Sequence, residues 1–314
     1  MLRGCEVCNH SLILVDFIDL CGNDQFVKHV GITLGDQAGI GPEVVRAALE
    51  SGNLPAGFDF KIIGETIDAC PGEPSRASAQ AALDALEESV QLLKSGEIDA
   101  VVTAPVGKEG LHELGFLFPG QTEFFAERLG CTNHAMCLTG KNLTVALVTI
   151  HVGVAEVPHL LDTDEIVRIG KLLAQFCHQR GITQPRIAVC GLNPHAGENG
   201  VFGREDIEII APAVDLLSQL GSGADYSGPH PPDTIFRPAA DGEYDAVLCM
   251  YHDQGLIPLK LLDFDTGVNV TLGLPYPRTS PDHGTAYDIA GTGKADASSM
   301  THAIQLACKM VSER

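Results

Sequence analysis

The chain has 314 residues, and 45% of them are hydrophobic, which is enough for one large domain or two of ordinary size. Its 41 acidic residues outnumber 20 basic ones, and a formal net charge of −21 argues against nucleic acid or an anionic membrane surface as a partner. No segment approaches the roughly 20 apolar residues that cross a bilayer, so the composition predicts a globular protein of the cytoplasm.

The cysteines favour the same compartment. Several lie in apolar segments, where a free cysteine behaves as a small hydrophobic residue: Cys137, Cys177, Cys190, Cys249 and Cys308. Residues 1–29 are rich in cysteine and lack periodicity, and we interpret them as an atypical N-terminal extension. A small zinc site at Cys5 and Cys8, with His10 and Cys21 nearby, is an alternative there that the irregular ligand spacing disfavours.

After residue 30, short apolar runs alternate with helical patterns. Apolar residues recur at helical spacing over 83–93, Gly96 is expected to end this helix, and residues 98–103 follow as a strand. Asp162 is expected to cap a second helix, which is followed by a strand at 186–190. This alternation is typical of an α/β fold with a largely parallel sheet.

Two further segments have compositions typical of turns or loops. The segment 35–43 links an apolar run to a helical pattern, and its glycines and Pro42 suit a tight turn into a helix. Its backbone amides are also placed to face an anion, so a simple turn and a ligand site both stay open. The stretch 221–232, rich in glycine and proline, is predicted to be a long surface loop.

Three apolar runs read as buried parallel strands, and each is followed by a loop that contains a histidine: 145–150 by His151, 187–190 by His195 and 246–250 by His252. Because ligands of parallel sheets gather beyond the carboxyl ends of the strands, these imidazoles are expected to meet. Neutral imidazole binds divalent metals, and three ligands with an open position suit a catalytic metal. A surface or hydrogen-bonded role explains any single histidine, but three in equivalent positions favour a metal site.

The segment 279–291 brings hydroxyls, carboxylates and an imidazole into what reads as one loop. Local turns explain such residues more simply, whereas a binding loop accounts better for their density. Lys260, Asn269 and Arg278 precede it, around the apolar run 268–272. Since lysine and arginine bind phosphate and carboxylate, we expect an anion-binding site in this otherwise acidic chain.

Seven motifs, in this order, resemble the 4-hydroxythreonine-4-phosphate dehydrogenase family of pyridoxal phosphate biosynthesis: GDQAGIGPE, TAPVGK, GQTEFF, LNPHAGENGVFGRE, YHDQGLIPLK, GVNVTLGLPYPRTSPDHGTAYDIAG and GKAD. The resemblance extends from about residue 30 to the C-terminus. It implies an isocitrate/isopropylmalate dehydrogenase-like fold over residues 30–314, with two α/β/α domains, largely parallel sheets and a cleft between them. The internal boundary is weakly marked and is expected to be discontinuous in sequence.

The resemblance also implies roles for residues of this chain. His151, His195 and His252 are expected to bind a divalent metal (zinc, magnesium or cobalt), with the site completed across a homodimer interface. Substrate contacts are implied for Gln121, Thr122, Lys260, Asn269 and Arg278. NAD is expected to lie along the loop that contains His283, Gly284, Thr285, Ala286 and Asp288.

The implied reaction is the NAD-dependent oxidation of 4-phosphohydroxy-L-threonine to 3-amino-2-oxopropyl phosphate. A secondary alcohol is oxidised, and the resulting β-keto acid loses carbon dioxide. The metal is expected to polarise the hydroxyl oxygen as a Lewis acid. The base that takes the alcohol proton is either Lys260 or a metal-bound water, and Asp253 is expected to orient an imidazole or to bind substrate.

Two features depart from the pattern of the family. Gln121 stands where the family has a histidine, so a neutral amide replaces a titratable imidazole. The segment between Gly64 and Ala77 is shorter than usual. Dehydrogenases of 4-phospho-D-threonate, 4-phospho-D-erythronate or cyclic dihydrodiols therefore remain an alternative. A phosphotransacetylase-like transferase accounts less well for the three histidines. A metal-binding protein that has lost catalysis, an alternative suggested by Gln121, is disfavoured because the other site residues are all present.

Overall fold

The computed structural model describes residues 27–313. Within them, ten strands form one sheet in the order β2-β1-β3-β10-β9-β4-β5-β8-β6-β7. Pairing is parallel toward both ends and antiparallel in the middle, where β9 pairs with β10 and with β4, and β4 with β5. The strands are β1 (Lys28–Thr33), β2 (Phe58–Ile63), β3 (Ala100–Thr103), β4 (Ala135–Thr139), β5 (Thr144–Leu147), β6 (Arg186–Cys190), β7 (Asp225–His230), β8 (Ala246–Cys249), β9 (Val268–Leu272) and β10 (Arg278–Pro281).

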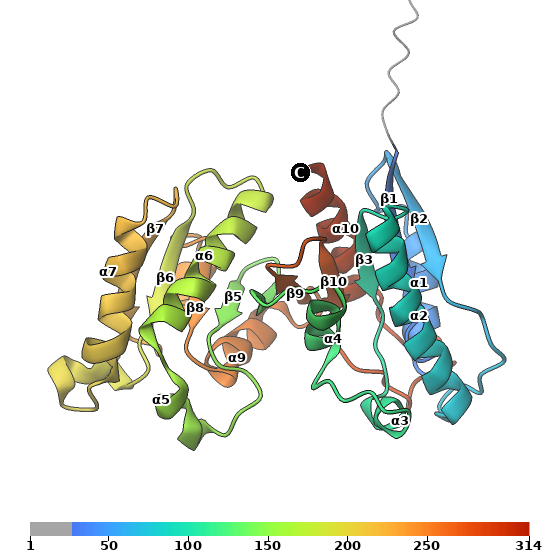
Figure 1. Cartoon of the computed structure of the whole chain (residues 1–314), viewed down its shortest axis with the longest axis horizontal. Helices are drawn as coiled ribbons and strands as arrows, with labels where there is room; N and C mark the ends of the chain where they lie inside the picture. The colour runs from blue at the N-terminus through green and yellow to red at the C-terminus, as the bar shows by residue number, and fades with distance from the viewer. Residues whose placement is uncertain (1–26, 314) are drawn as a thin grey trace, which may run out of the picture.

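Helices cover the sheet and divide the molecule into two lobes (Figure 1). The first lobe contains α1 (Gly41–Glu50), α2 (Arg76–Ser95), α3 (Lys108–Glu113), α4 (Gln121–Arg128) and α10 (Ser298–Ser312). The second contains α5 (Val157–Leu160), α6 (Thr163–Gln179), α7 (Ala211–Gln219), α8 (Phe236–Ala240) and α9 (His252–Asp263), with the short helical turns η1 (Val154–Glu156), η2 (Pro194–Gly200) and η3 (Asp206–Ile210). Because β10 and α10 return to the first lobe, its sheet is built from both ends of the described chain.

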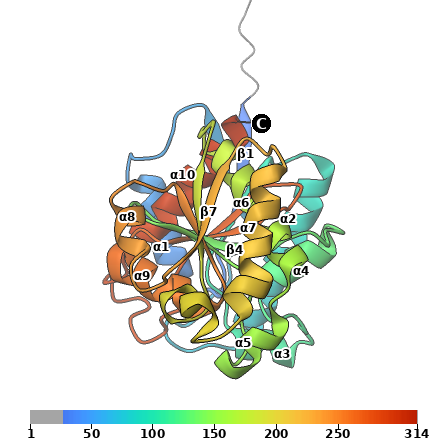
Figure 2. The same ribbon diagram turned by 90° about the vertical axis from the view of Figure 1, so that its left-hand side faces the viewer.

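The strands between the edge strands β2 and β7 are mostly buried on both faces. Val102 of β3 packs in the layer that contains α1 and α10, whereas the next residue toward the N-terminus, Val101, packs against α2. Figure 2 looks onto the second lobe, where α8 and α9 lie on one side of β7 and α6 and α7 on the other. This two-sided burial explains why the strand sequences read as continuous apolar runs.

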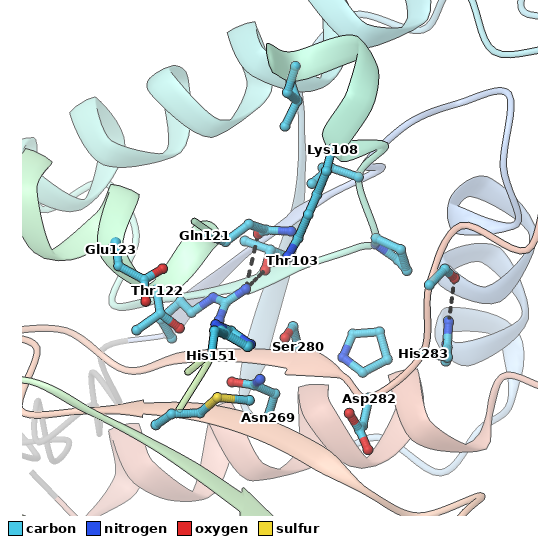
Figure 3. Close-up of a pocket in the computed structure, with 18 of the residues that line it drawn as sticks. Thr103, Lys108, Gln121, Thr122, Glu123, His151, Asn269, Ser280, Asp282 and His283 are labelled. Atoms are coloured by element: carbon cyan, nitrogen blue, oxygen red, sulfur yellow. Dashed lines mark hydrogen bonds between the residues drawn. The ribbon is translucent and has the colours of Figure 1, made fainter. Parts of the chain in front are cut away.

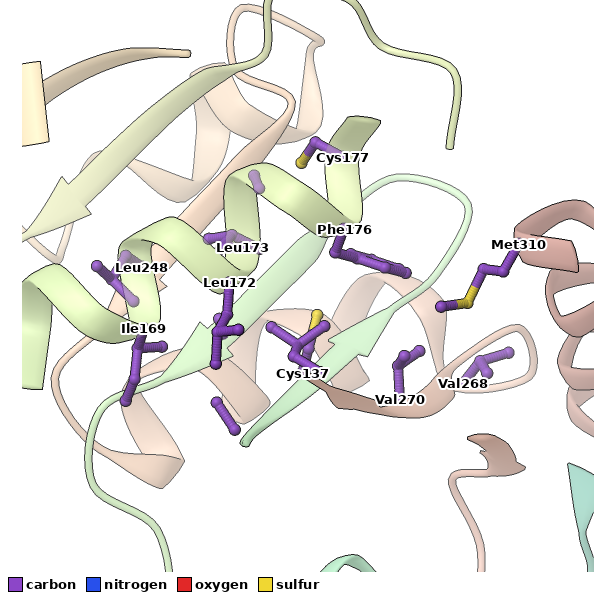
Figure 4. Packing of buried hydrophobic residues seen from close by; sticks show 14 of the residues in the cluster. Cys137, Ile169, Leu172, Leu173, Phe176, Cys177, Leu248, Val268, Val270 and Met310 are labelled. Atoms are coloured by element: carbon purple, nitrogen blue, oxygen red, sulfur yellow. The ribbon is translucent and has the colours of Figure 1, made fainter. Parts of the chain in front are cut away.

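A single apolar layer connects the lobes on one face of the sheet. Figure 4 shows Leu172 and Phe176 of α6 above Cys137 and Val270 of the central strands, with Met310 of α10 beside them. The α/β fold with a mostly parallel sheet is confirmed. The division into two domains stays a prediction, because the lobes share both this layer and the sheet.

Several expected elements are present. The helix over 83–93 is part of α2, and it ends at Gly96 with a φ of 76°, a left-handed conformation that glycine adopts without strain. Asp162 caps α6 by accepting hydrogen bonds from the amides of Asp164 and Glu165. The three strands that precede the histidines lie side by side and parallel as β5, β8 and β6, although β5 is shorter than predicted.

One loop prediction was wrong, and another was wrong in part. The stretch 221–232 contains β7, which pairs with β6 at the end of the sheet, where a strand needs backbone partners on one side only and tolerates Gly228 and Pro229. The prediction of a loop at 279–291 was wrong only for residues 279–281, which belong to β10, a central strand whose buried Thr279 donates a hydrogen bond to the carbonyl of Ala303. Residues 282–291 form a loop, as predicted. Because the side chains of β10 are largely polar, a search for apolar runs does not identify it as a strand.

The five cysteines of the apolar segments are buried and unbridged, as expected. Cys5 and Cys8, with the rest of residues 1–26, lie outside the described part of the chain. Among residues 27–313, none of the helices has the length and apolarity to cross a membrane.

Candidate functional site

A pocket of about 380 Å³ lies between the lobes and gathers most of the residues proposed from sequence (Figure 3). Those that line it are Gln121, Thr122, His151, Lys260, Asn269, Arg278, His283 and Gly284. They come from α4, the loop after β5, α9, β9, β10 and the loop after β10, so segments far apart in sequence converge here. Thr285, Ala286 and Asp288 do not line the pocket and follow it along the chain.

Arg278 is the buried cation of the pocket, with 3% of its surface exposed. Its Nη2 donates to Thr103 Oγ1 at 2.6 Å and to Gln121 Oε1 at 3.0 Å, and its guanidinium lies 5.8 Å from the centre of the Phe125 ring. Burial lowers the pKa of the guanidinium to about 10, while the carboxylate of Glu123 opposes that shift. Arg278 is therefore still charged at neutral pH, and its geometry is fixed before any ligand arrives.

Three buried polar atoms of the pocket have no hydrogen-bond partner among the described residues: Arg278 Nε, Asn269 Oδ1 and His283 Nε2. Arg278 Nε can only donate, and Asn269 Oδ1 can only accept. Because buried polar atoms are costly to leave unpaired, this combination suits a ligand that carries both an anion and a hydroxyl or ammonium group.

Lys260 and Thr122 are held by neighbours within the pocket. Lys260 Nζ forms an ion pair with Asp282 Oδ2 at 2.9 Å. Thr122 Oγ1 lies 3.2 Å from Thr271 Oγ1, which in turn accepts a hydrogen bond of 3.4 Å from Arg278 Nη1. Thr122 thus contributes to the polar network that orients Arg278.

Two of the three histidines approach each other. The rings of His151 and His252 have centroids 5.7 Å apart, and His252 Nδ1 lies 2.7 Å from Asp253 Oδ1. Asp253 is therefore placed to orient the His252 imidazole, one of the two roles expected for it. Desolvation lowers the pKa of His151, and the positive charge of Lys108 lowers it further, which favours the neutral, metal-binding form.

His195 does not join this pair. No group of three potential metal-binding side chains occurs among residues 27–313 of one chain. His195 is exposed in η2, beside the ring of Phe202, and it has a φ of 53°. Ala196, Glu198 and Asn199 share this left-handed conformation, which costs non-glycine residues free energy and is concentrated at functional sites.

The loop expected to bind NAD packs against the turn at 35–43. The amide of Ile40 donates to the carbonyl of Thr285 at 2.9 Å, and the Tyr287 hydroxyl donates to Asp36 Oδ2 at 2.7 Å. The amides of Asp36, Ala38 and Gly39 also donate to protein acceptors. Of the two interpretations of 35–43, the structure therefore favours a packing turn over a direct anion site.

The pocket also contains residues to which the sequence had assigned no role, notably Lys108, Glu123, Thr103 and Ser280. Lys108 and Glu123 belong to the motifs TAPVGK and GQTEFF, so a signal was present. Neither residue follows an apolar run directly, and the chemistry of a lone lysine or glutamate does not distinguish it from a solvated surface charge.

Comparison with known proteins is consistent with this site. The family profile described as "Pyridoxal phosphate biosynthetic protein PdxA" matches residues 41–307. A 4-hydroxythreonine-4-phosphate dehydrogenase of Caulobacter vibrioides is 44% identical over 91% of this chain and 98% of its own. A D-threonate 4-phosphate dehydrogenase of Pectobacterium atrosepticum is 40% identical over 90% of this chain and 99% of its own.

The crystal structure of 4-hydroxythreonine-4-phosphate dehydrogenase from Klebsiella pneumoniae is 37% identical in sequence and has a TM-score of 0.80. The match covers 92% of this chain and 99% of that one. The protein is therefore a dehydrogenase that acts on a hydroxyl group, and it belongs to the PdxA family of pyridoxal phosphate biosynthetic proteins.

Proposed function

We propose that the protein catalyses the NAD- and metal-dependent oxidation and decarboxylation of 4-phosphohydroxy-L-threonine to 3-amino-2-oxopropyl phosphate, in pyridoxal phosphate biosynthesis. The observation that carries this proposal is the set of unpaired atoms in the pocket, which suits an anionic substrate that also donates hydrogen bonds. The names of similar proteins support the same substrate. The buried free cysteines support a reducing, cytoplasmic location.

Glu123 favours the amino acid over a hydroxy acid as the substrate. It lines the pocket and forms no hydrogen bond or ion pair within residues 27–313. A carboxylate in that position complements the ammonium group of 4-phosphohydroxy-L-threonine, which 4-phospho-D-threonate lacks. The second candidate is nevertheless 4-phospho-D-threonate, because one close relative is named for it and Gln121 departs from the family.

The residues present fit a metal and a nicotinamide cofactor. His151 and His252 supply two imidazoles, and the buried His283 Nε2, which has no partner among residues 27–313, suits a polar group of NAD. When bound, the metal polarises the substrate hydroxyl and NAD accepts the hydride. Zinc, magnesium and cobalt are the metals to compare.

The side chains of this protein then have separate tasks. Arg278 holds the anionic end of the substrate through Nε, while Thr103 and Gln121 keep the guanidinium in place. Lys260 first passes its own proton to its ion-pair partner Asp282, and the neutral amine at Nζ then takes the alcohol proton.

The active protein is proposed to be a homodimer that shares its metal sites. The helix α9 begins at His252 and exposes Ile257 and Leu261. With Phe264, the residue directly after the helix, they recur at helical spacing and form an apolar stripe. The exposed His195 is displayed on a strained turn next to Phe202, which is half exposed. We expect His195 of one protomer to complete the His151 and His252 pair of the other.

The first experiment is NADH formation by metal-stripped protein, with and without zinc, magnesium or cobalt. The substrates are 4-phosphohydroxy-L-threonine, 4-phospho-D-threonate, 4-phospho-D-erythronate and a cyclic dihydrodiol. We expect metal-restored turnover of the first. Turnover of only one of the other substrates would assign that compound as the substrate in place of 4-phosphohydroxy-L-threonine. No turnover with any of the four would contradict the proposed activity.

A mixing experiment tests the shared metal site. His195→Ala and His252→Ala are each expected to be inactive. If the site is shared, a mixed dimer has one site with all three histidines, so random mixing should restore about a quarter of the wild-type activity. If all three histidines belonged to one chain, mixing would restore nothing. Mixing His151→Ala with His252→Ala, which leaves every site incomplete, is the matched control.

A further inference from the structure

Lys108 is a residue of the pocket for which the sequence predicted no role. It starts α3, and Figure 3 shows its side chain pointing toward Thr103 and Gln121. The loop between β3 and α3, which precedes Lys108, packs against neighbouring segments. The amide of Asp36 donates to the Pro105 carbonyl at 2.9 Å, and a Cβ at position 107 would lie 2.3 Å from the Tyr287 hydroxyl oxygen. A side chain at position 107 would displace the Tyr287 hydroxyl from Asp36, so this packing favours glycine and positions the start of the Lys108 side chain.

The cations of the pocket differ in whether they are already paired. Lys260 is neutralised by Asp282. Within residues 27–313, Lys108 forms neither a hydrogen bond nor an ion pair, and Arg278 Nε has no partner. Glu123 is the unpaired carboxylate that faces them. The pocket therefore has two cationic groups free to receive a ligand, in a chain with a net charge of −21.

An exposed lysine without a partner is ordinarily a solvated surface charge. Two observations argue for more here. Lys108 lines the same cavity as Arg278, and its side chain points into the region of Thr103 and Gln121 (Figure 3). The second observation is independent of Lys108: the buried Arg278 has an unpaired donor in the same cavity.

We propose that Lys108 and Arg278 together bind the phosphate group of the substrate. This inference rests on the proposed function, which supplies a phosphorylated substrate. A phosphate carries a charge of about −1.5 to −2 near pH 7 and has three terminal oxygens, so it matches two cations, whereas a carboxylate requires one. Gln121 Nε2, whose contact with the Ala104 carbonyl is 3.4 Å long, supplies a third donor to the same group.

The probe is inorganic phosphate, titrated into the metal-loaded protein at constant ionic strength and followed by calorimetry. Lys108→Met is expected to weaken phosphate binding about tenfold or more, as the loss of a charged hydrogen bond does. Lys108→Arg should retain most of the affinity. Lys94→Met, which removes an exposed lysine of α2 outside the pocket, should bind phosphate as the wild type does. Repeating the titrations after chelation excludes phosphate bound to the metal.

Unchanged affinity in Lys108→Met, or no phosphate binding by the wild-type protein, overturns the proposal. In kinetics, Lys108→Met should raise the KM for the phosphorylated substrate and leave the KM for NAD unchanged. The binding measurement does not depend on turnover. Phosphate binding that requires Lys108 in a protein without activity would therefore support this subsite and reject the proposed function, and turnover with Lys108-independent phosphate binding would do the reverse.

Discussion

The contact between Gln121 and Arg278 decides how the side chain that is proposed to bind the anion is held. Gln121 Oε1 accepts a hydrogen bond from the buried guanidinium at 3.0 Å. An amide oxygen accepts at every physiological pH, whereas an imidazole loses its acceptor nitrogen when it is protonated. The amide at position 121 thus makes the position of Arg278 insensitive to acidification.

Gln121→His is expected to make substrate binding depend on pH. Above the imidazole pKa the ring nitrogen accepts from Arg278, and below it an imidazolium repels the guanidinium. The KM of the variant relative to the wild type should therefore rise between about pH 8 and pH 6. Gln121→Asn is the titration-free control. Parallel pH profiles for Gln121→His and the wild type would show that the amide does not control Arg278.

The sequence could place single site residues but not their partners. Each histidine was identifiable from the strand before it, and Lys260, Asn269 and Arg278 line one pocket. That His195 stands apart from His151 and His252 depends on the tertiary arrangement of loops. Lys108 is similar, because the role proposed for it depends on the neutralisation of Lys260 by Asp282, two residues far from it in sequence.

At the scale of elements, the loop that follows β10 is fastened to the turn between β1 and α1. The Tyr287 hydroxyl donates to Asp36, which is 2% exposed, and the Thr285 carbonyl accepts from Ile40. Burial and the Asp36 carboxylate raise the pKa of Tyr287 to about 12. The protonated phenol is therefore the form that the fold stabilises.

Tyr287→Phe should change how stability depends on pH at alkaline values. In the wild type, the pKa of Tyr287 is raised above its unfolded value of 10, so its contribution is present below pH 10 and is lost as pH rises through about 12. The difference in unfolding free energy between wild type and variant should shrink across that range. Urea unfolding at several pH values measures it, and a constant difference would contradict the role of the hydrogen bond.

Elements with a strong local signal were predictable, and those that depend on pairing were not. The helix α2 has helical periodicity, a capping box at Ser75 and a glycine at its end, so local chemistry specifies it. The strand β7 contains glycine and proline and forms because β6 offers an open edge. The strand β10 is polar and forms because β3 and β9 hold it from both sides.

At the scale of the whole molecule, the apolar stripe along α9 is a candidate for a contact with another protein surface. Ile257, Leu261 and Phe264 are 66%, 83% and 72% exposed. Such contiguous apolar surface is typical of an interface between subunits.

If the proposed homodimer is correct, Leu261→Glu is expected to yield a monomer and to abolish metal-dependent turnover, because a charge in the proposed interface is costly and the proposed third metal ligand, His195 of the other protomer, is lost. Sedimentation velocity and NADH formation measure the two effects. Leu216→Glu, at an exposed position of α7 that is 44% accessible, is the matched control and should change neither. A monomeric Leu261→Glu variant with full activity would separate the metal site from the dimer.

The order of strands also has a consequence for protein synthesis. In the sheet β10 lies between β3 and β9, yet both β9 and β10 are translated after most of the chain. Until they emerge from the ribosome, β3 has an unpaired edge and the nascent chain carries two incomplete half-sheets. Such edges are templates for aggregation. A premature stop codon after α9 would therefore leave most of the residues in place and still yield no foldable fragment.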